Sequence, residues 1–326
     1  MAEAILGLAA YPRDRVWQNV ELLVRSVRLH SPRTAIVLVT APLGDADRFL
    51  FDEYRVESVE AIEPSPRLGV DHKAAAARRR EWLFELYGRR HALYRAAIEA
   101  RDETHFLLAD TRDVIVTAPL EAVTTVSRLV LSQEHAATPI AANHWNRDWI
   151  AEGYGEGERA ALGHRPILCA GTVFGPRQAV LGYLAAMSDE VQRVGVELTQ
   201  RIGDQPLHNH LAYAGQLPDF EISAAEDGWM RSIGITPFDE LRFDWEPRQP
   251  PDQTPPTCLV LHQYDRHLDH ARMRAAVAHA AGVPPYHRWR FSAYLEYGRG
   301  PVPRTLRLIR AVKRAITRRL MRQAYG

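Results

Sequence analysis

The sequence predicts an α/β fold of three layers, in which helices cover both faces of a mixed sheet. Segments typical of strands and of helices alternate along the first half of the chain. The composition agrees, since 46% of the 326 residues are apolar, which is enough for a large buried core. We see no internal repeat and predict one domain over residues 1–285, followed by a tail over residues 286–326.

The first elements predict a β-α-β unit. Residues 4–10 form an uninterrupted apolar run typical of a buried strand, and apolar residues between 16 and 27 recur at helical spacing. A β-branched run at residues 34–40 then ends in the turn sequence Ala-Pro-Leu-Gly. This order predicts two parallel strands joined by a right-handed crossover.

The later elements alternate less regularly. An apolar strand over residues 105–108 leads to Asp110, and a polar, aromatic stretch over residues 143–157 predicts a long loop that covers substrate. The other predicted elements are helices near residues 73–87, 89–100, 177–187 and 204–214, strands at 126–132, 167–174 and 258–261, and a proline-rich linker at 247–256. Because ligands bind outside the carboxyl ends of parallel strands, chemistry is expected around Asp110.

The cysteines and the apolar runs predict a cytoplasmic protein. Cys169 and Cys258 lie in apolar stretches, without the spacing of a disulfide framework or a zinc site, which indicates a reducing compartment. The apolar run at residues 4–10 is too short, and too weakly flanked by positive charge, for a signal peptide. No apolar run reaches the roughly 18 residues that cross a bilayer, so we do not expect an integral membrane protein.

Basic charge is concentrated at the end of the chain. The formal net charge is +1, yet the last 26 residues carry eight Arg and Lys and no acid, so the rest is acidic. Residues 304–322 predict a basic amphipathic helix, which would lie on an anionic membrane surface, making the protein peripheral at the inner face, or pack its apolar stripe on the body. Nucleic acid is not expected as a partner, because the acidic body would repel phosphate.

Two acids follow the strand at residues 105–108. Asp110 and Asp113 could present oxygens to a hard cation such as Mg²⁺ or Mn²⁺, which retains positions for substrate phosphates. Acids after a strand also form turns or cap helices. The spacing alone therefore leaves a structural and a metal-binding interpretation open.

Four short motifs follow one another along the middle of the chain. The first is Ala-Asp-Thr-Arg-Asp (109–113), behind the helix segment His-Ala-Leu-Tyr-Arg (91–95). The other three are Cys-Ala-Gly-Thr-Val-Phe-Gly (169–175), Gly-Asp-Gln-Pro-Leu-His-Asn (203–209) and Leu-Val-Leu-His-Gln-Tyr (259–264). In this order they resemble the Asp-x-Asp region, the Asn-Ala-Gly stretch, the Asp-Gln-x-x-Leu-Asn element and the late strand with a metal-binding His of GT-A fold glycosyltransferases, which use nucleotide diphosphate sugars. The resemblance spans roughly residues 90–265.

This resemblance implies a three-layer GT-A fold and transfer of a hexose from a nucleotide diphosphate sugar to a saccharide or glycolipid acceptor, as in the synthesis of lipopolysaccharide and surface polysaccharide. It leans toward retention of anomeric configuration. Asp110, Asp113 and His262 would hold Mn²⁺ or Mg²⁺, while Asp204 and Gln205 would act at the reacting face. The further residues expected to contact the donor are Ala9, Tyr11, Arg95, Ala170 and Gly171.

The chain departs from the family pattern at two positions. Two residues separate the acids instead of one, and Arg112 occupies the position of the second acid, where it could neutralise phosphate without a metal. Cys169 replaces the Asn of Asn-Ala-Gly. Individual residues also have ordinary alternatives, since Asp204 suits a helix N-cap and Gly171 could ease strand packing.

Three other functions fit parts of the sequence. His262, His267 and His270 with Asp265, or His208 with His210, could form a metal-dependent hydrolase site. A nucleotidyltransferase would use a similar pair of acids, but the chain lacks a glycine-rich phosphate loop. A scaffold protein that binds a nucleotide sugar without catalysis is the third alternative, which Arg112 favours.

Overall fold

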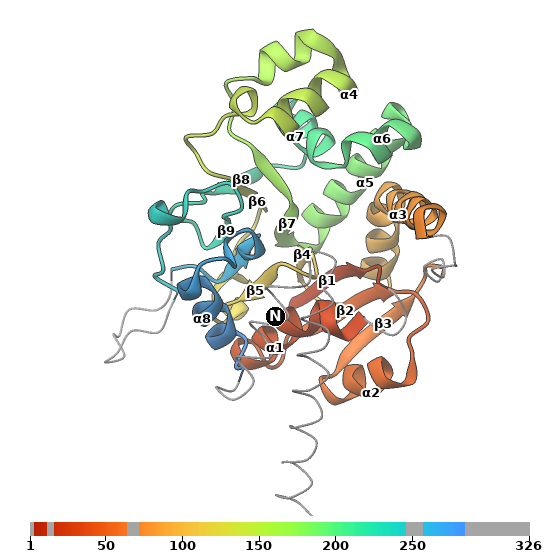
Figure 1. Cartoon of the computed structure of the whole chain (residues 1–326), viewed down its shortest axis with the longest axis vertical. Helices are drawn as coiled ribbons and strands as arrows, with labels where there is room; N and C mark the ends of the chain where they lie inside the picture. The colour runs from red at the N-terminus through yellow and green to blue at the C-terminus, as the bar shows by residue number, and fades with distance from the viewer. Residues whose placement is uncertain (1–2, 12–15, 64–71, 246–256, 284–326) are drawn as a thin grey trace, which may run out of the picture.

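The computed structural model describes residues 3–11, 16–63, 72–245 and 257–283, and its core is a mixed sheet flanked by helices (Figure 1). The strands of this sheet are β1 (Glu3–Ala9), β2 (Ala35–Thr40), β3 (Val56–Glu60), β4 (His105–Ala109), β6 (Leu129–Gln133), β7 (Leu168–Pro176) and β8 (Phe220–Ser223). Their order is β3-β2-β1-β4-β7-β6-β8, and among these seven strands only β7 runs antiparallel to its neighbours. The predicted α/β class is confirmed.

A smaller sheet accompanies the large one. Its strands are β5 (Val114–Val116), β10 (Val260–His262) and β9 (Met230–Ser232), in that order. The helices of the described residues are α1 (Val16–His30), α2 (Asp45–Glu53), α3 (His72–Glu99), α4 (His144–Leu162), α5 (Arg177–Val194), α6 (Val196–Ile202), α7 (Gln205–Tyr213) and α8 (Ala271–Ala280). Short 3-10 helices lie at Leu120–Val123, Ile140–Ala142, Phe238–Glu240 and Tyr264–His267. The smaller sheet matters for function because β10 ends at His262.

The predicted β-α-β unit is confirmed in β1, α1 and β2. The strands β1 and β2 pair in parallel, with Ala4 opposite Ala35, and β4 pairs in parallel on the other edge of β1. Side chains alternate along β1, so that Leu6 lies in the core on one face of the sheet and Ile5 in the core on the other. Both faces of this strand are therefore covered, as in parallel sheets generally.

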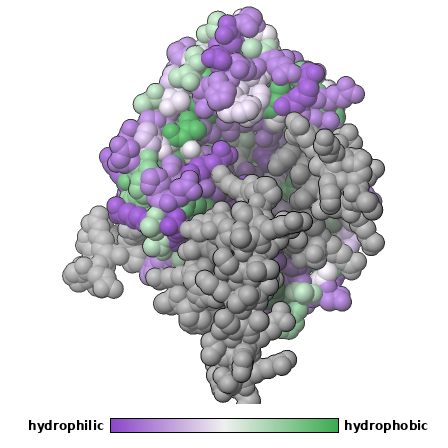
Figure 2. All heavy atoms as spheres, viewed as in Figure 1, coloured by the Kyte–Doolittle hydropathy of each residue, from purple (hydrophilic) through white to green (hydrophobic). Residues whose placement is uncertain are grey.

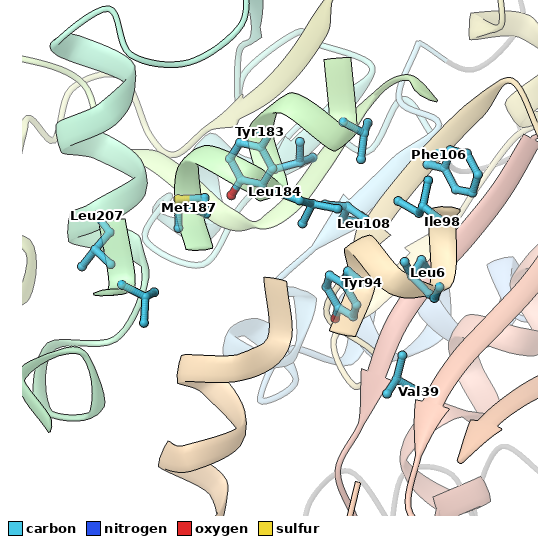
Figure 3. Packing of buried hydrophobic residues seen from close by; sticks show 14 of the residues in the cluster. Leu6, Val39, Tyr94, Ile98, Phe106, Leu108, Tyr183, Leu184, Met187 and Leu207 are labelled. Carbon is cyan, nitrogen blue, oxygen red and sulfur yellow. The ribbon is translucent and has the colours of Figure 1, made fainter. Parts of the chain in front are cut away.

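One helical layer packs on the face that Leu6 occupies. Tyr94 and Ile98 of α3 and Tyr183, Leu184 and Met187 of α5 are buried there (Figure 3). Burying one large apolar side chain contributes roughly 1.5–3 kcal/mol, so this layer fixes α3 firmly on the sheet. The orientation of α3 matters because Arg90, a buried residue one turn before Tyr94, reaches the functional site.

The opposite face is covered by α1, α2 and the smaller sheet. Val20, Leu23 and Val27 of α1 recur at helical spacing and are fully buried against Ile5 and neighbouring strand residues. Residues of β5 and β10 belong to the same apolar cluster. The described chain therefore has helices on both sides of its central sheet, which is the three-layer arrangement predicted from the sequence.

Two predicted helices are one continuous helix. The sequence predicted separate helices near residues 73–87 and 89–100, with a break at Gly88, but α3 runs from His72 to Glu99. A Cβ atom at Gly88 would lie 3.4 Å from Val196 of α6. Gly88 therefore lies within the helix, facing α6, and does not end it.

The predicted substrate-covering loop at residues 143–157 is wrong, because most of it lies in α4. Asn143 caps this helix by accepting a hydrogen bond from the backbone N–H of Asn146 at 3.1 Å. Ile150 is buried on the inner side of the helix. Only Gly155, with φ of 85°, leaves the helical conformation and produces a kink. The glycines that suggested a loop are thus accommodated within a helix.

Other differences are local. The elements α2, β3, α6, β8 and β9 were not predicted from the sequence. The predicted linker at 247–256, the tail at 286–326 and its amphipathic helix at 304–322 lie outside the described residues. In the part of the chain that is described, no helix has the length and apolar content to cross a membrane. The described surface visible in Figure 2 is largely hydrophilic with scattered apolar residues.

Candidate metal centre

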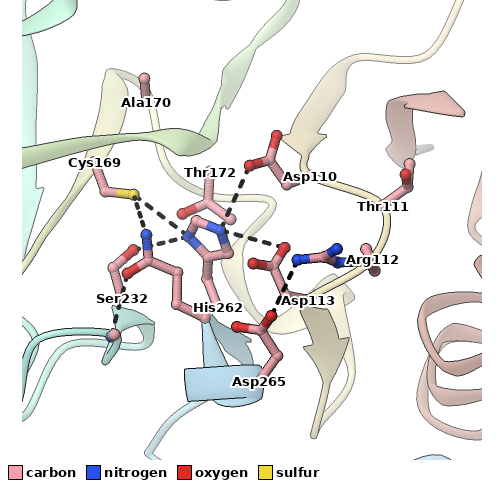
Figure 4. A network of polar contacts seen from close by, with 12 residues as sticks. Asp110, Thr111, Arg112, Asp113, Cys169, Ala170, Thr172, Ser232, His262 and Asp265 are labelled. Atoms are coloured by element: carbon pink, nitrogen blue, oxygen red, sulfur yellow. Dashed lines mark hydrogen bonds and ion pairs between the residues drawn. The ribbon is translucent and has the colours of Figure 1, made fainter. Parts of the chain in front are cut away.

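Three of the predicted metal ligands meet at one end of the central sheet. Asp110 follows β4, Asp113 precedes β5, and His262 is the last residue of β10 (Figure 4). Their candidate ligand atoms lie within 4.8 Å of one another, and the Nε2 atom of His262 is 3.7 Å from an oxygen of each acid. The structure therefore brings together the residues from two motifs about 150 residues apart in sequence.

His262 is held by its other ring nitrogen. Nδ1 lies 3.1 Å from the Ser232 hydroxyl and 3.4 Å from the sulfur of Cys169, while Nε2 has no hydrogen-bond partner among the described residues. The Ser232 hydroxyl is also hydrogen-bonded to the Ser132 hydroxyl at 3.0 Å. A histidine fixed through one nitrogen presents the other in the orientation a metal requires. Cys169, the departure from Asn-Ala-Gly, thus belongs to the support of this ring.

Gly171 explains how the acid and the histidine come so close. A Cβ atom at this position would lie 2.3 Å from Cε1 of His262 and 2.8 Å from a carboxylate oxygen of Asp110. The backbone carbonyl of Gly171 also accepts a hydrogen bond from the Asp110 N–H at 2.8 Å. Glycine was predicted to let the backbone approach a donor sugar, but the structure gives it a direct role in the packing of the candidate ligands.

Replacement of Gly171 by alanine is therefore expected to weaken Mn²⁺ binding at least about tenfold, the scale on which neighbours of ligands tune metal affinity. The added methyl group must displace His262 or Asp110, because both contacts are shorter than carbon atoms tolerate. Electron paramagnetic resonance of free Mn²⁺ in a titration measures the affinity. Gly157→Ala in α4, where nothing lies within 4 Å of an added Cβ, is the matched control. Equal affinity in both variants would contradict this role.

The charges of the centre perturb one another. Burial raises the pKa of Asp113, and the charges of Asp110 and Asp265 raise it further against the opposing effect of His262. Burial alone would also raise the pKa of Asp110, but His262 and Arg90 outweigh it and lower that pKa. Groups whose pKa values are driven apart in a confined space are typical of functional sites.

The pKa of His262 is raised, as is that of Asp113. Burial disfavours a charged ring, yet Cys169, Asp113 and Asp110 together raise the pKa of His262 well above 6.5. Without a cation, the neighbouring acids therefore favour the protonated form of the imidazole. Cation binding at Nε2 must displace this proton, so affinity should decrease as the pH falls.

An arginine that the sequence analysis missed joins the centre to Asp204. Arg90 of α3 is buried, lies 3.3 Å from Asp110, forms an ion pair with Asp204 and donates to the Ala170 carbonyl at 3.2 Å. Burial lowers the pKa of Arg90, but Asp204 and Asp110 together raise it. A permanently charged guanidinium thus lies beside the candidate metal ligands.

Arg95, which was predicted to contact the donor, is not at this site. Its side chain is about half exposed and pairs with Glu99 at 2.8 Å on the outer side of α3. Helical spacing distinguishes the two arginines, because Arg90 shares a face with Tyr94 and Ile98, both buried, whereas Arg95 does not. That signal was available in the sequence.

Asp204 and Gln205 lie where α7 begins. Asp204 is at the N-cap position but makes no side-chain capping bond, and instead pairs with Arg90. Burial raises the pKa of Asp204 against the charge of Arg90. The Gln205 amide donates to Glu134 at 3.2 Å and to Asn146 at 2.9 Å. Asp204 therefore occupies the N-cap position, as the capping alternative expected, but its side chain does not cap the helix.

Glu134 is a second residue that sequence analysis missed. It follows β6, is 3% exposed, and burial raises its pKa although His262 and Gln205 lower it. A buried acid whose side-chain partners are the Gln205 amide and the Cys169 thiol is unusual, since such groups are ordinarily paired with a cation. Its place after a strand was the only signal of its role in the sequence.

The remaining predicted donor residues lie around β1, in the loop after β4 and in β7. The Tyr11 hydroxyl lies 3.0 Å from that of Thr111, next to Asp110. Ala9 is fully buried in the core, so its side chain has no exposed surface for a ligand. Arg112 is exposed and pairs with Asp265 at 3.2 Å. Ala170 faces Arg90 through its carbonyl and lines, with Tyr94, Tyr183 and Gly171, a small hollow beside Asp110.

The histidines of the alternative hydrolase site do not come together. His267 bonds to the Ile233 carbonyl at 2.8 Å, and His270 stacks on Phe238 with ring centroids 3.5 Å apart. Neither belongs to the group formed by His262 and the two acids, which is the one candidate metal cluster in the described residues. His208 and His210 also separate, His208 toward Tyr183 and His210 toward Glu158.

With this geometry established, the chain was compared with known proteins. No family model matches the sequence. No curated protein matches it either. The interpretation of the site therefore rests on its residues.

His208 lies behind the centre and is expected to make the protein acid-sensitive. Burial, and then the charge of Arg90, lower its pKa from 6.5 to about 3, while its Nδ1 lies 3.0 Å from the Tyr183 hydroxyl. As the pH falls below 6.5 the unfolded chain takes up a proton that the folded chain refuses. The contribution of His208 to the free energy of unfolding is therefore fully present above pH 6.5. Below this pH it decreases by up to about 1.4 kcal/mol per pH unit.

Urea unfolding between pH 4.5 and 7.5 measures this slope. We expect His208→Gln to reduce the slope of stability against pH below 6.5 by about half. The other half remains because burial also strongly lowers the pKa of His91, which still contributes to the slope. His144→Gln, on the exposed side of α4, should leave the slope as it is in the wild type. A wild-type slope in His208→Gln would show that the proton is taken up elsewhere.

Proposed function

We propose that this chain is a metal-dependent glycosyltransferase of the GT-A type, which transfers a hexose from a nucleotide diphosphate sugar to an acceptor. The observation that carries the proposal is the convergence of Asp110, Asp113 and His262 within 4.8 Å at the end of β4. This end of the sheet, beside the carboxyl end of the parallel strand β1, is where ligands bind in open α/β sheets.

The residues suit a divalent cation. Two carboxylates favour Mg²⁺ or Mn²⁺, and an imidazole nitrogen favours transition metals, so Mn²⁺ satisfies the whole donor set best. The Nε2 atom of His262 is buried, lacks a hydrogen-bond partner among the described residues and faces both acids. Asp110 is more exposed than the other two, which leaves an open side for a diphosphate. When bound, the cation would neutralise charge on the departing nucleotide diphosphate.

The surrounding residues support transfer of a sugar. Arg90 carries a fixed positive charge beside Asp110, and such charges stabilise a leaving phosphate in a site shielded from water. Asp204, held by Arg90, would bind donor hydroxyls, and Gln205 would lie at the reacting carbon with Glu134 behind it. Tyr11 and Thr111 border the same loop and would contact the nucleotide. Arg90 thereby takes the role that the sequence had suggested for Arg95.

A thermal-shift panel of nucleotide diphosphates and nucleotide sugars, with and without Mn²⁺, tests the proposal. A ligand at one hundred times its dissociation constant stabilises the native state by about 2.7 kcal/mol, which is readily detected. We expect one nucleotide sugar to raise the melting temperature only with Mn²⁺, and Asp110→Ala to abolish the effect. Asp219→Asn, an exposed acid on the loop before β8, is the control and should behave as the wild type.

The other outcomes separate the alternatives. Stabilisation by a nucleotide sugar without turnover, even with a panel of acceptors and water, would indicate the non-catalytic binding protein. Nucleotide sugar binding that ignores Mn²⁺ but is lost in Arg112→Ala would indicate neutralisation by arginine in place of a metal. Absence of any nucleotide effect in the wild type would refute the proposed function.

A further inference from the structure

The aromatic segment at the start of α4 has no role in the centre described so far. His144, Trp145 and Trp149 lie on this helix, and Trp145 is 58% exposed, the only exposed large apolar side chain that the described residues place on α4. The rings form a continuous series, with centroids 4.8 Å apart between His144 and Trp145 and 5.6 Å apart between Trp145 and Trp149. We call these three residues the aromatic platform.

The platform is fixed at its base. Trp149 is partly buried against the main apolar cluster, and Asn143 caps the helix one residue before His144. Trp145 is stacked obliquely on both neighbours, which restricts its rotamers. An exposed tryptophan held in this way is ready to bind a ligand without losing much side-chain freedom.

The platform is connected to the proposed reacting face. Asn146, between Trp145 and Trp149 in the sequence, is 4% exposed, and its side-chain oxygen accepts the hydrogen bond from Gln205 at 2.9 Å. Gln205 also donates to Glu134 and adjoins Asp204. Trp145 is therefore separated by one residue position from the hydrogen-bond chain that leads to the residues we place around the transferred sugar.

The charge of α4 identifies the chemistry of the ligand. The helix carries four acids and two arginines, and Asp148, adjacent to Trp149, is exposed in a pair with Arg147 at 2.8 Å. The other three acids are also ion-paired, Glu152 to Arg201, Glu156 to Arg159 and Glu158 to His210, so the helix has no surplus of positive charge that would attract anionic lipid headgroups or phosphate-bearing partners. It does not disfavour a neutral sugar, whose weakly positive C–H face suits the negative face of an aromatic ring and whose hydroxyls suit nearby polar groups.

The area also argues against a protein partner. Stable protein interfaces bury about 800 Å² per partner around a cluster of apolar residues. Here the exposed apolar part of the helix is a single tryptophan with a histidine beside it, surrounded by charged side chains. Such a small, flat aromatic surface matches one or two sugar rings.

We propose that the aromatic platform binds a neutral saccharide, which, given the proposed function, is the acceptor. The sugar ring stacks on Trp145, and the chain of contacts through Asn146 to Gln205 holds it beside the donor. This inference selects a neutral saccharide over an anionic glycolipid headgroup as the group that α4 recognises.

The experiment measures binding of the full chain to an array of neutral and acidic oligosaccharides and to vesicles of phosphatidylglycerol and phosphatidylcholine, without donor. We expect at least one neutral oligosaccharide to bind, Trp145→Ala to weaken that binding at least tenfold, and Trp145→Phe to retain most of it. Phe49→Ala, which removes a ring from α2 that is more exposed than Trp145, should have no effect. Melting temperatures of all variants should equal that of the wild type, because the substituted rings are exposed.

Several outcomes would overturn the inference. They are the absence of saccharide binding by the wild type, equal binding by Trp145→Ala, and loss in Trp145→Ala of vesicle binding only. The result is separable from the proposed function, because the assay needs no nucleotide. Saccharide binding without any response to nucleotide sugars would refute the transferase and retain the platform, whereas a nucleotide sugar response without saccharide binding would refute the platform alone.

Discussion

Asp113→Asn is expected to lower turnover of the nucleotide sugar on the order of a thousandfold while leaving the metal-free protein at least as stable as the wild type. A thousandfold corresponds to about 4 kcal/mol of transition-state stabilisation, the scale of a metal acting on a departing oxyanion. The stability is expected to rise because Asp113 is a buried acid close to Asp110 and Asp265, and these charges raise its pKa. Removal of its charge eliminates both the cost of burying a charged group and the repulsion from Asp110 and Asp265.

This prediction is specific because turnover is expected to decrease while stability is expected to increase. If Asp113 only supported the fold, its substitution would lower both the turnover and the stability of the protein. The measurements are release of nucleotide diphosphate at saturating Mn²⁺ and the melting temperature without metal, which should increase by about 2 °C for a gain near 1 kcal/mol. Asp219→Asn provides the comparison for an exposed acid. Wild-type turnover in Asp113→Asn would remove this residue from the metal site.

The central fold could be predicted because its segments are locally unambiguous. The apolar run that became β1 and the helical spacing of Val20, Leu23 and Val27 each allow one interpretation, and the position of Asp110 after a buried strand follows from them. The sequence also identified the three residues of the candidate metal cluster, although Asp113 and His262 are about 150 residues apart. Motif order carried this information, since spacing alone could not.

The errors have physical causes. Three glycines within α4 suggested a loop, but the Asn143 cap and the buried residues of the helix outweigh them, and only Gly155 leaves the helical conformation. Glycine costs roughly 1 kcal/mol in a helix, which tertiary packing can offset. The network from Glu134 through Gln205 to Asn146 joins β6, α7 and α4, and no local pattern in a single segment could indicate it.

The prediction of Arg95 in place of Arg90 is an error of a different kind. Both arginines lie on α3 a few residues apart, and a motif places either of them before Asp110. The face of the helix decides between them, and helical spacing already places Arg90 on the buried face with Tyr94, whereas Arg95 lies on the exposed face. The structure therefore changes the residue that should be mutated first.

Arg90→Met is expected to destabilise the protein by about 3–5 kcal/mol, the usual cost of removing one partner from a buried ion pair. The side chain of Arg90 is 7% exposed and that of Asp204 is 14% exposed, so water cannot replace the guanidinium. Urea unfolding measures the effect. Arg95→Met on the outer side of the same helix should change the free energy of unfolding by no more than about 0.5 kcal/mol. Similar losses in both variants would contradict the assignment.

A double variant separates stability from function at this position. Most of the cost in Arg90→Met is expected to come from the charge of Asp204 that remains buried without its partner, so Arg90→Met with Asp204→Leu should recover a large part of it. Turnover should not recover, because the positive charge beside Asp110 and the acid at the start of α7 are both absent. A protein that regained stability without activity would show that the pair is retained for its chemistry, since an apolar pair would satisfy the fold.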